Sequence, residues 1–266
     1  MEYLEEPIEN AFGAPVWHIA ETASTMDDAK NLAAQGASDG TAIYADYQRS
    51  GRCRVEGRVW ESTAGENLLC TVILRRAAVP GFTLRVGIAA ARAFDGYLPE
   101  GIHTTIKWPN DVLLGGKKLS GILCETAGDV IAVGTGFNLG QRSFPSELTA
   151  RATSLALALE GSGIPLPTRE AFLARYLRCL HEALTDADWA AAVTERLWKR
   201  GERVSLLSGD PGRNELVEGV VEGIGPAGEL LFRVAADSSA DGAPDRAGSE
   251  GSTIRRIFSG EFPYGA

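Results

Sequence analysis

The sequence holds few residues that bind metals or form disulfides. It has three histidines and four cysteines among 266 residues. The histidines stand far apart, and the cysteines show neither paired spacing nor a zinc pattern. We therefore expect neither a disulfide framework nor a zinc site. This cysteine usage favours the reducing cytoplasm as the compartment.

Long apolar runs and a surplus of basic residues are also missing. No run of about 18 apolar residues occurs, and the acidic N-terminus lacks the features of a secretory signal. Lys and Arg total 26 against 35 Asp and Glu, which gives a net charge of -9. Because phosphate neutralisation needs a basic surface, this balance argues against nonspecific nucleic-acid binding. We expect neither a membrane nor a nucleic-acid partner.

The remaining composition is that of a globular protein. The hydrophobic fraction is 44% and the charged fraction 23%. The length predicts one large domain, or a large one with a small one. The 31 glycines indicate many tight turns or ligand sites lined by backbone.

Charge and turn residues are concentrated in one stretch, Lys107–Glu125. Val112–Leu114 is typical of a short buried strand, and Leu119–Glu125 of its returning partner. Between them, Gly115 and Gly116 favour a two-residue hairpin turn, because glycine adopts positive φ without steric cost.

This hairpin would hold an acid and two bases on rigid backbone. Asp111 lies at one end of the predicted hairpin, and Lys117 and Lys118 lie at the other. The alternative is a surface hairpin with solvated lysines, and this stretch alone does not decide between the two interpretations.

A second charged stretch, Gly51–Trp60, is the strongest basic cluster of an acidic chain. Four arginines stand in the ten positions from 49 to 58, with two glycines among them. Guanidinium groups match phosphate and carboxylate geometry, and glycines let backbone N–H groups approach an anion. Trp60 could stack on the flat ring of a ligand. The alternative interpretation is a solvated flexible loop.

Two weaker signals flank these stretches. Ser24 and Thr25 precede a helical run and are sufficiently explained as helix caps, although a helix N-terminus also offers N–H groups to a polar ligand. Gly134 and Gly136 stand at the end of a buried strand and indicate close approach of a ligand or a bend in the sheet. Asn138 has the alternative role of a turn residue.

The rest of the chain alternates strand and helix patterns as far as residue 200. Residues 1–15 show no periodicity and are expected to form an extended arm. Strands are predicted at Val16–Ala20, Thr41–Tyr47, Asn67–Leu74, Thr104–Trp108 and Val130–Thr135, and helices at Met26–Gly36, Thr83–Leu98, Thr168–Leu184 and Trp189–Arg200.

From Gly201 the pattern changes to short strands separated by glycine turns. These strands are predicted at Arg203–Leu207, Leu216–Ile224, Glu229–Val234 and Thr253–Phe258. They predict a small antiparallel barrel or sheet. Ala235–Ser252 has no large apolar residue, so we expect it to be a flexible insertion.

These stretches together resemble the biotin protein ligases over nearly the whole chain from about Trp17. Lys107–Asp111 and Lys118–Glu125 look like the family's KWPND and KLAGILVE elements, a highly specific combination. Gly51–Trp60 looks like its GRGRRGRxW loop. Ser24-Thr25-Met26 falls where the family has Ser-Thr-Asn, and Gly134–Leu139 is similar to its G-x-G-x-N segment.

The resemblance implies an α+β fold. It would comprise a catalytic domain at residues 1–198, with a mixed sheet packed with helices as in class II synthetases and biotin/lipoate ligases. A small SH3-like β-barrel would follow at residues 199–266, with the flexible insertion at about 235–252. Roughly sixteen residues precede the first predicted strand, so we expect no N-terminal DNA-binding domain of the kind found in repressor members of the family.

The resemblance also implies an ATP-dependent ligase that forms biotinyl-AMP and then modifies a lysine of a biotin carboxyl carrier protein. Lys118 would act at the junction of carboxylate and phosphate, Arg54 would retain the adenylate, and Asp111 would serve Mg²⁺ and the phosphates. The ligand-binding residues that it implies are Ser24, Thr25, Gln48, Gly51, Arg52, Arg58, Trp60, Asn67, Lys107, Asn110, Gly121, Gly134, Gly136 and Asn138.

Within that set, the resemblance divides the substrates between two groups. Ser24, Thr25 and Gln48 match residues around the ureido ring of biotin. Arg58 and Trp60 match positions that serve the nucleotide, and the asparagines 67 and 138 are polar contacts on the same side.

Four departures from the family pattern concern ligand-binding segments. The arginine loop is one residue longer, Cys53 replaces a glycine and Glu56 adds a negative charge. Met26 replaces the usual asparagine. Because a Cβ at position 53 restricts φ, the loop is the part of the site that we expect to differ most from the family.

Two other functions share features with this prediction. Lipoate or octanoyl ligases and transferases have the same catalytic fold but lack the arginine–glycine loop and the KWPND element. A non-catalytic biotin-binding protein would keep the pocket without turnover. The resemblance leaves a homodimer open as a further partner.

Overall fold

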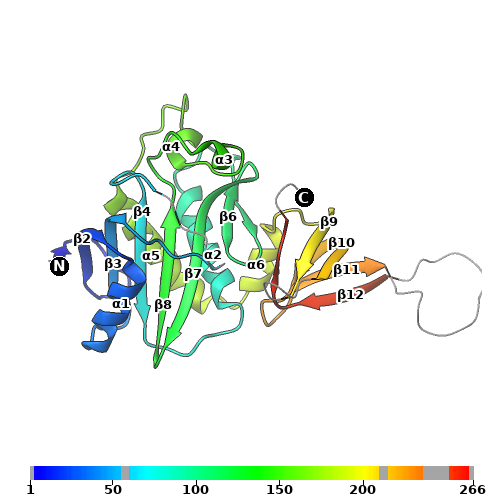
Figure 1. Ribbon diagram of the computed structural model, residues 1–266, viewed down its shortest axis with the longest axis horizontal. Helices are drawn as coiled ribbons and strands as arrows, with labels where there is room; N and C mark the ends of the chain where they lie inside the picture. Colours follow the sequence, from blue (N-terminus) through cyan, green and yellow to red (C-terminus); the bar gives the residue numbers. More distant parts are fainter. Residues whose placement is uncertain (1–2, 55–59, 61, 210–214, 236–251, 264–266) are drawn as a thin grey trace, which may run out of the picture.

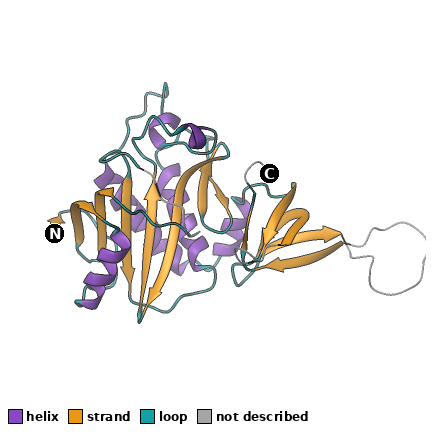
Figure 2. Cartoon of the chain, viewed as in Figure 1, coloured by secondary structure: helices purple, strands orange, loops and turns teal. Residues whose placement is uncertain are grey.

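The structure is a computed structural model that describes residues 3–54, 60, 62–209, 215–235 and 252–263. It contains two β-sheets with helices packed against the larger one (Figures 1 and 2). The larger sheet has eight strands in the spatial order β1 (Leu4–Glu6), β2 (Val16–Thr22), β3 (Ala42–Gln48), β4 (Leu68–Leu74), β8 (Val130–Phe137), β7 (Lys117–Ala127), β6 (Asp111–Leu114) and β5 (Thr105–Lys107).

This sheet is mixed, as predicted. β2 and β3 run parallel, and every other neighbouring pair is antiparallel. A parallel pair needs a crossover connection, and helix α1 (Thr25–Ala34) supplies it between β2 and β3.

Helices cover both faces of the large sheet. Side chains alternate between the faces along β8: Gly134 lies against Met26 of α1, whereas the Thr135 hydroxyl bonds the Tyr176 hydroxyl at 3.0 Å. Tyr176 belongs to α5 (Arg169–Thr185), which packs beside α2 (Phe82–Asp95). The cleft described below therefore opens on the face that carries α1.

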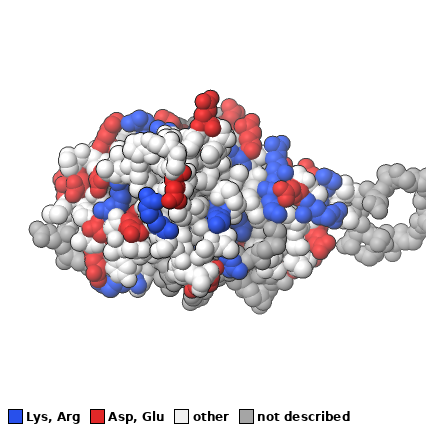
Figure 3. Space-filling model, turned by 90° about the horizontal axis from the view of Figure 1, so that it is seen from above, with Lys and Arg blue, Asp and Glu red and all other residues white. Residues whose placement is uncertain are grey.

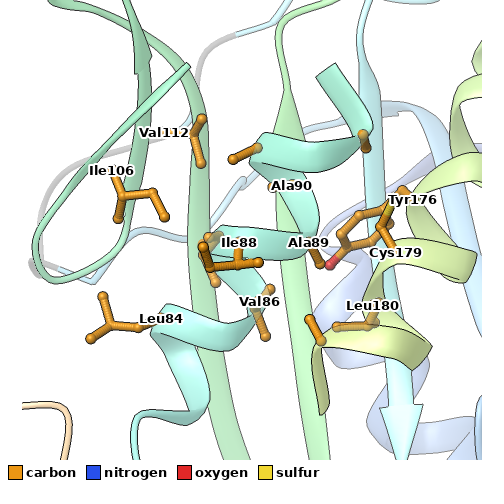
Figure 4. Packing of buried hydrophobic residues seen from close by; sticks show 14 of the residues in the cluster. Leu84, Val86, Ile88, Ala89, Ala90, Ile106, Val112, Tyr176, Cys179 and Leu180 are labelled. Carbon is orange, nitrogen blue, oxygen red and sulfur yellow. The ribbon is translucent and has the colours of Figure 1, made fainter. Parts of the chain in front are cut away.

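The main core lies between the sheet, α2 and α5. Figure 4 shows α2 side chains between Ile106 and Val112 of the sheet and Tyr176 and Leu180 of α5. Eleven of the fourteen residues of α2 are buried, several of them alanines, so the helix can approach both neighbours closely. This core packs against β7 and β8 on the face opposite the cleft.

Helices α1 and α5 begin at a capping hydroxyl, and the first of these caps, Ser24, is one that the sequence predicts. The Ser24 hydroxyl accepts from the Met26 N–H at 3.3 Å, and the Thr168 hydroxyl accepts from the Ala171 N–H at 3.1 Å. The short helices are α3 (Ser146–Thr149), α4 (Leu155–Ala158) and α6 (Trp189–Glu195).

The second sheet is antiparallel throughout. Its order is β12 (Ser252–Ile257), β11 (Leu230–Ala235), β10 (Glu215–Ile224), β9 (Arg203–Ser208) and β13 (Gly260–Glu261). The prediction of a small antiparallel sheet is confirmed. Within the residues that are described, the sheet is open, with β12 and β13 at its edges, so a closed barrel is not confirmed. The predicted insertion lies largely outside the described residues.

The second sheet is anchored next to the predicted hairpin. The indole N–H of Trp108 donates to the Gly228 carbonyl at 3.1 Å, and the Ile224 N–H donates to the Thr194 hydroxyl of α6 at 3.0 Å. Figure 1 shows α6 between the two sheets. Trp108, just before the hairpin, is therefore bonded to the second sheet, and α6 joins that sheet as well.

The N-terminal arm contains a strand that the sequence did not predict. Leu4–Glu6 forms the edge strand β1, paired with β2 through Leu4 opposite His18. Three residues are too few to show a period of two, and the strand is specified by backbone pairing with β2.

No helix in the described segments has both the length and the apolar character needed to cross a membrane. Figure 3 shows Lys and Arg side chains interspersed with Asp and Glu over the face seen from above. This mixture fits the overall charge balance that the sequence shows.

Candidate active site

A cleft opens on the α1 face of the large sheet and encloses about 510 Å³ of empty space, part of it open to solvent. Its lining comes from the start of α1, the end of β3, the arginine loop, β4, β7 and β8. The lining residues are Ser24, Thr25, Met26, Gln48, Arg52, Cys53, Arg54, Trp60, Cys70, Lys118, Gly121, Ile122, Leu123, Gly134, Thr135 and Gly136.

Glycines make the floor of the cleft flat. Gly121 of β7 and Gly136 of β8 are paired in register, and the Trp60 indole lies over both. A Cβ on Gly136 would come within 2.6 Å of the indole, and one on Gly121 within 2.8 Å. A third glycine, Gly134, leaves room for the Met26 side chain. The glycines are therefore required for close approach of rings to the sheet.

The family resemblance places Trp60 on the nucleotide side, so Gly136→Ala, whose added methyl group would displace Trp60 from the floor, is expected to raise the KM for the nucleotide about tenfold. The free energy of unfolding should change by less than about 1 kcal/mol, since the indole lies at an open cleft and can move. Steady-state kinetics and urea unfolding measure the two effects.

Gly87→Ala is the matched control for this change. Gly87 lies on α2, where an added Cβ would meet its neighbours at an ordinary 3.8 Å. Equal nucleotide KM values for Gly136→Ala and wild type would show that the indole position does not matter for binding.

Polar side chains gather at the end of the cleft next to α1. The Gln48 side-chain oxygen accepts from the Thr25 N–H at 2.8 Å and from the Thr25 hydroxyl at 3.0 Å. Ser24, one residue earlier, is 1% exposed and caps the helix. The capping role of Ser24 is confirmed, and its predicted contact with a ligand stays a prediction.

The predicted hairpin brings its acid and one of its bases into contact. Lys118 Nζ lies 2.7 Å from Asp111 Oδ1, and 5.4 Å from the centre of the Trp60 ring. Gly115 and Gly116 form the turn with φ of 57° and 77°, as predicted. Lys117 is exposed and donates to the Thr149 carbonyl, so only Lys118 lines the cleft.

The first arginine of the loop is held at the cleft rim by two carboxylates. Arg52 Nη1 lies 3.0 Å from Asp27 Oδ1 of α1, and its Nη2 lies 3.0 Å from Glu125 Oε1 of β7. Lys30 Nζ lies 2.5 Å from the other Glu125 oxygen. These ion pairs join both walls of the cleft through the arginine loop.

The second arginine contacts the smaller sheet. Arg54 Nη2 donates to the Gly260 carbonyl at 3.2 Å and lies 3.7 Å from the Glu261 carboxylate. Both arginines line the cleft and retain accessible guanidinium groups. Arg58, which the sequence also predicts at this site, lies outside the described residues.

The two predicted asparagine contacts are engaged with protein. Asn67 is fully buried, and its side chain accepts from the Leu139 N–H at 3.0 Å and donates to Gln141 at 2.6 Å. Asn138 donates to the Thr153 carbonyl at 3.0 Å. Both side chains fix the chain that leaves β8, and their predicted contact with a nucleotide stays a prediction.

Three other predicted residues lie around the cleft without lining it. Asn110 donates to the Ile122 carbonyl at 2.9 Å, which ties the start of the hairpin to its returning strand β7. Lys107 Nζ lies 5.1 Å from the centre of the Trp198 ring. Gly51 packs against Trp60, and the backbone N–H of Trp60 donates to the Gly51 carbonyl at 3.1 Å.

Two of the thiols near the cleft, those of Cys70 and Cys124, are shielded from water. Burial raises the pKa of Cys70 well above its usual value, and raises the pKa of Cys124 to about 12. Because the thiolate is the nucleophilic form, the geometry does not support either cysteine as a nucleophile.

Some residues that hold the lining residues in place were not predicted from the sequence. Thr71 of β4 donates from its hydroxyl to the Thr25 hydroxyl at 2.9 Å, and Asp27 and Glu125 hold Arg52. Thr71 lies in a strand that is buried on both faces, so the sequence shows no alternation of polar and apolar residues that would single it out. The carboxylates lie far from Arg52 in sequence, and only the fold brings them together.

The chain is similar to known proteins over most of its length. Residues 19–140 match the biotin/lipoate A/B protein ligase family. The chain is 33% identical over 231 residues to the biotin–[acetyl-CoA-carboxylase] ligase of Mycobacterium tuberculosis, covering 81% of this chain and 82% of that protein. It is 39% identical over 146 residues to the bifunctional ligase/repressor BirA of Bacillus spizizenii, covering 51% of this chain and 44% of that protein.

The fold is similar as well. A biotin protein ligase from Aquifex aeolicus, solved in complex with biotin and ATP, has a TM-score of 0.73 and 28% identity, covering 93% of this chain and 97% of that one. The chain spans less than half of the length of the Bacillus relative. On the Mycobacterium match and the family model, the chain belongs to the biotin/lipoate A/B protein ligase family, among the biotin protein ligases.

Proposed function

We propose that the chain activates biotin with ATP to biotinyl-AMP and transfers the biotinyl group to a lysine of a biotin carboxyl carrier protein. The observation that carries the proposal is one cleft that combines three kinds of group. Thr25 and Gln48 offer neutral polar contacts at one end, Lys118 and the arginine loop offer cations, and Gly121 and Gly136 offer a flat floor.

The first step joins two anions. A carboxylate oxygen of biotin attacks the α-phosphorus of ATP, and the bond from that phosphorus to the bridging oxygen breaks as pyrophosphate leaves. Charge accumulates on the oxygens around the phosphorus, so a fixed cation nearby lowers the barrier. Lys118 is held on β7 beside Asp111 and lines the cleft, which suits it to this role.

The donor set allows one mode of Mg²⁺ binding. No group of three His, Cys, Asp or Glu side chains suited to a metal occurs in the part of the chain that the structure describes. Mg²⁺ with nucleotides is usually held by one or two carboxylates, substrate phosphates and water, and Asp111, beside Lys118, fits that mode. When bound, the ion would neutralise phosphate charge.

The second step forms the amide bond. The lysine amine of the carrier attacks the acyl carbon of biotinyl-AMP, the bond from that carbon to the phosphate oxygen breaks, and the nitrogen loses a proton as AMP leaves. Water competes with the amine for the same carbon. Arg52 and Arg54 on a loop over the cleft would retain the adenylate and exclude water.

Pyrophosphate release with ATP and Mg²⁺ tests this function. We expect release with biotin, and none above background with lipoate or octanoate. Release with lipoate or octanoate alone would contradict the proposal in favour of the lipoate ligases. Tight biotin binding without any release would instead indicate a non-catalytic binding protein. Adding apo carrier protein and detecting its biotinylated lysine by mass spectrometry tests the second step.

The division of the chain is part of the same proposal. Residues 1–198, which hold the large sheet and the cleft, would be the catalytic domain, and residues 199–266 the SH3-like domain. The five antiparallel strands of the second sheet support this division. We place the protein in the cytoplasm, where reducing conditions suit its four free cysteines and where a carrier protein would be met. A homodimer stays a prediction.

A further inference from the structure

We infer that Thr71 is a positioning residue for biotin, which acts through Thr25 to fix the side-chain amide of Gln48. The inference rests on the proposed function, because it concerns the ring end of the same cleft. Thr71 does not line the cleft, and neither its sequence position nor the family resemblance marked it.

Three side chains form a directed chain of hydrogen bonds. The Thr71 hydroxyl donates to the Thr25 hydroxyl at 2.9 Å, and the Thr25 hydroxyl donates to the Gln48 side-chain oxygen at 3.0 Å. The Thr25 N–H donates to the same oxygen at 2.8 Å. Since each hydroxyl has one proton, Thr71 as donor leaves the Thr25 proton for Gln48.

The three side chains of this hydrogen-bond chain lie on rigid elements. Thr71 is fully buried in β4, where it is paired in register with Gly134 of the cleft floor, and Thr25 is 3% exposed at the start of α1. Gln48 is the last residue of β3. A buried hydroxyl must be paired to avoid a desolvation cost. Loss of either threonine hydroxyl bond would therefore be unfavourable, which keeps this arrangement in place.

The consequence for the ligand is a fixed donor. Both lone-pair sites of the Gln48 oxygen are occupied by Thr25, so the amide NH₂ must face away from it. Among the residues that the structure describes, the Gln48 NH₂ donates to no protein acceptor, and Gln48 lines the cleft. The bicyclic ring of biotin has one strong acceptor, the ureido oxygen. The structure assigns the Gln48 NH₂ to that oxygen.

Thr71→Val is the direct test, because valine keeps the shape and removes the hydroxyl. We expect the Kd for biotin, measured by isothermal titration calorimetry, to rise about tenfold, while the KM for ATP stays within about twofold of wild type. A tenfold change corresponds to about 1.4 kcal/mol, the size of one hydrogen bond inside a protein. Thr71→Ser should restore the wild-type Kd, because it restores the donor.

A second ligand separates positioning from a general loss of structure. 2-Iminobiotin, which is protonated near neutral pH, presents only donors where biotin presents its oxygen. A fixed Gln48 donor should disfavour it, and the ratio of its Kd to that of biotin should fall severalfold in Thr71→Val. A merely structural role for Thr71 would weaken both ligands equally and leave the ratio unchanged.

Thr41→Val is the matched control. Thr41 is also a buried threonine, 1% exposed, whose hydroxyl lies 3.1 Å from that of Ser38, at the other end of β3 from Gln48. The Thr41→Val variant should bind biotin with the wild-type Kd. If Thr71→Val does not fold, Thr71→Cys, with its weaker donor, should show an intermediate Kd.

The outcomes for Thr71 and for the proposed function are distinguishable. A wild-type Kd in Thr71→Val, or a loss of biotin affinity that Thr71→Ser does not restore, would overturn the positioning role while wild type still releases pyrophosphate. If wild type neither binds biotin nor releases pyrophosphate with it, the proposed function fails, and with it the assignment of the ureido oxygen.

Discussion

Lys118→Ala is expected to lower the rate of adenylate formation by about 10³-fold, which corresponds to about 4 kcal/mol of transition-state stabilisation. The reason is that Lys118 is the lysine of the hairpin whose ammonium lines the cleft. Pyrophosphate release under saturating biotin and ATP measures the rate. The fold should persist, because the Lys118 side chain is 33% exposed and contributes little to the packed core.

Lys117→Ala provides the matched control for Lys118. The two lysines are neighbours on the same strand, but Lys117 is exposed and points to the Thr149 carbonyl. It should adenylate biotin at the wild-type rate. Equal turnover in the Lys118 variant and in wild type would show that the central cation of the site has been placed wrongly.

Arg54→Gly is expected to increase release of biotinyl-AMP by about 30- to 100-fold. A guanidinium bound to a phosphate contributes about 2 to 3 kcal/mol, and glycine removes it along with the contacts to Gly260 and Glu261. Free adenylate acylates amines without selection. The measurement is biotin incorporation into a bystander protein such as albumin, followed by streptavidin blotting.

Two further variants serve as controls for the leakage expected from Arg54→Gly. Arg54→Lys keeps the charge without the planar fork, so it should leak to an intermediate extent. Arg49→Gly removes an arginine nearby whose partner is Glu21, with both side chains more than half exposed, and should not leak. Leakage from Arg49→Gly equal to that from Arg54→Gly would mean that loop flexibility, and not the Arg54 phosphate contact, controls retention.

Most of the fold could be predicted because its elements carry strong local patterns. The two glycines at positions 115 and 116 specify a tight hairpin wherever it lies in a protein, and the caps Ser24 and Thr168 specify helix starts. β1 was missed because three residues show no period. Closure of the second sheet could not be derived, since it depends on which strands meet at its edges.

The candidate site divides in the same way. Lys118, Arg52, Arg54 and Trp60 were predicted from their segments, and the fold brings them to one cleft. The contacts that hold them were not predicted. Asp27 and Glu125 lie on different elements from Arg52, and their ion pairs depend on α1 and β7 flanking one opening.

The sequence by itself determined the chemistry that is available: a cationic loop, a hairpin with a lysine, and glycines where backbone must be approached closely. These are properties of residue types at short spacing, and they hold in any fold. Only the tertiary structure decided which groups meet. Thr71, Thr25 and Gln48 come from three elements, and their order as donor, relay and acceptor exists because β3, β4 and α1 pack at hydrogen-bond distance.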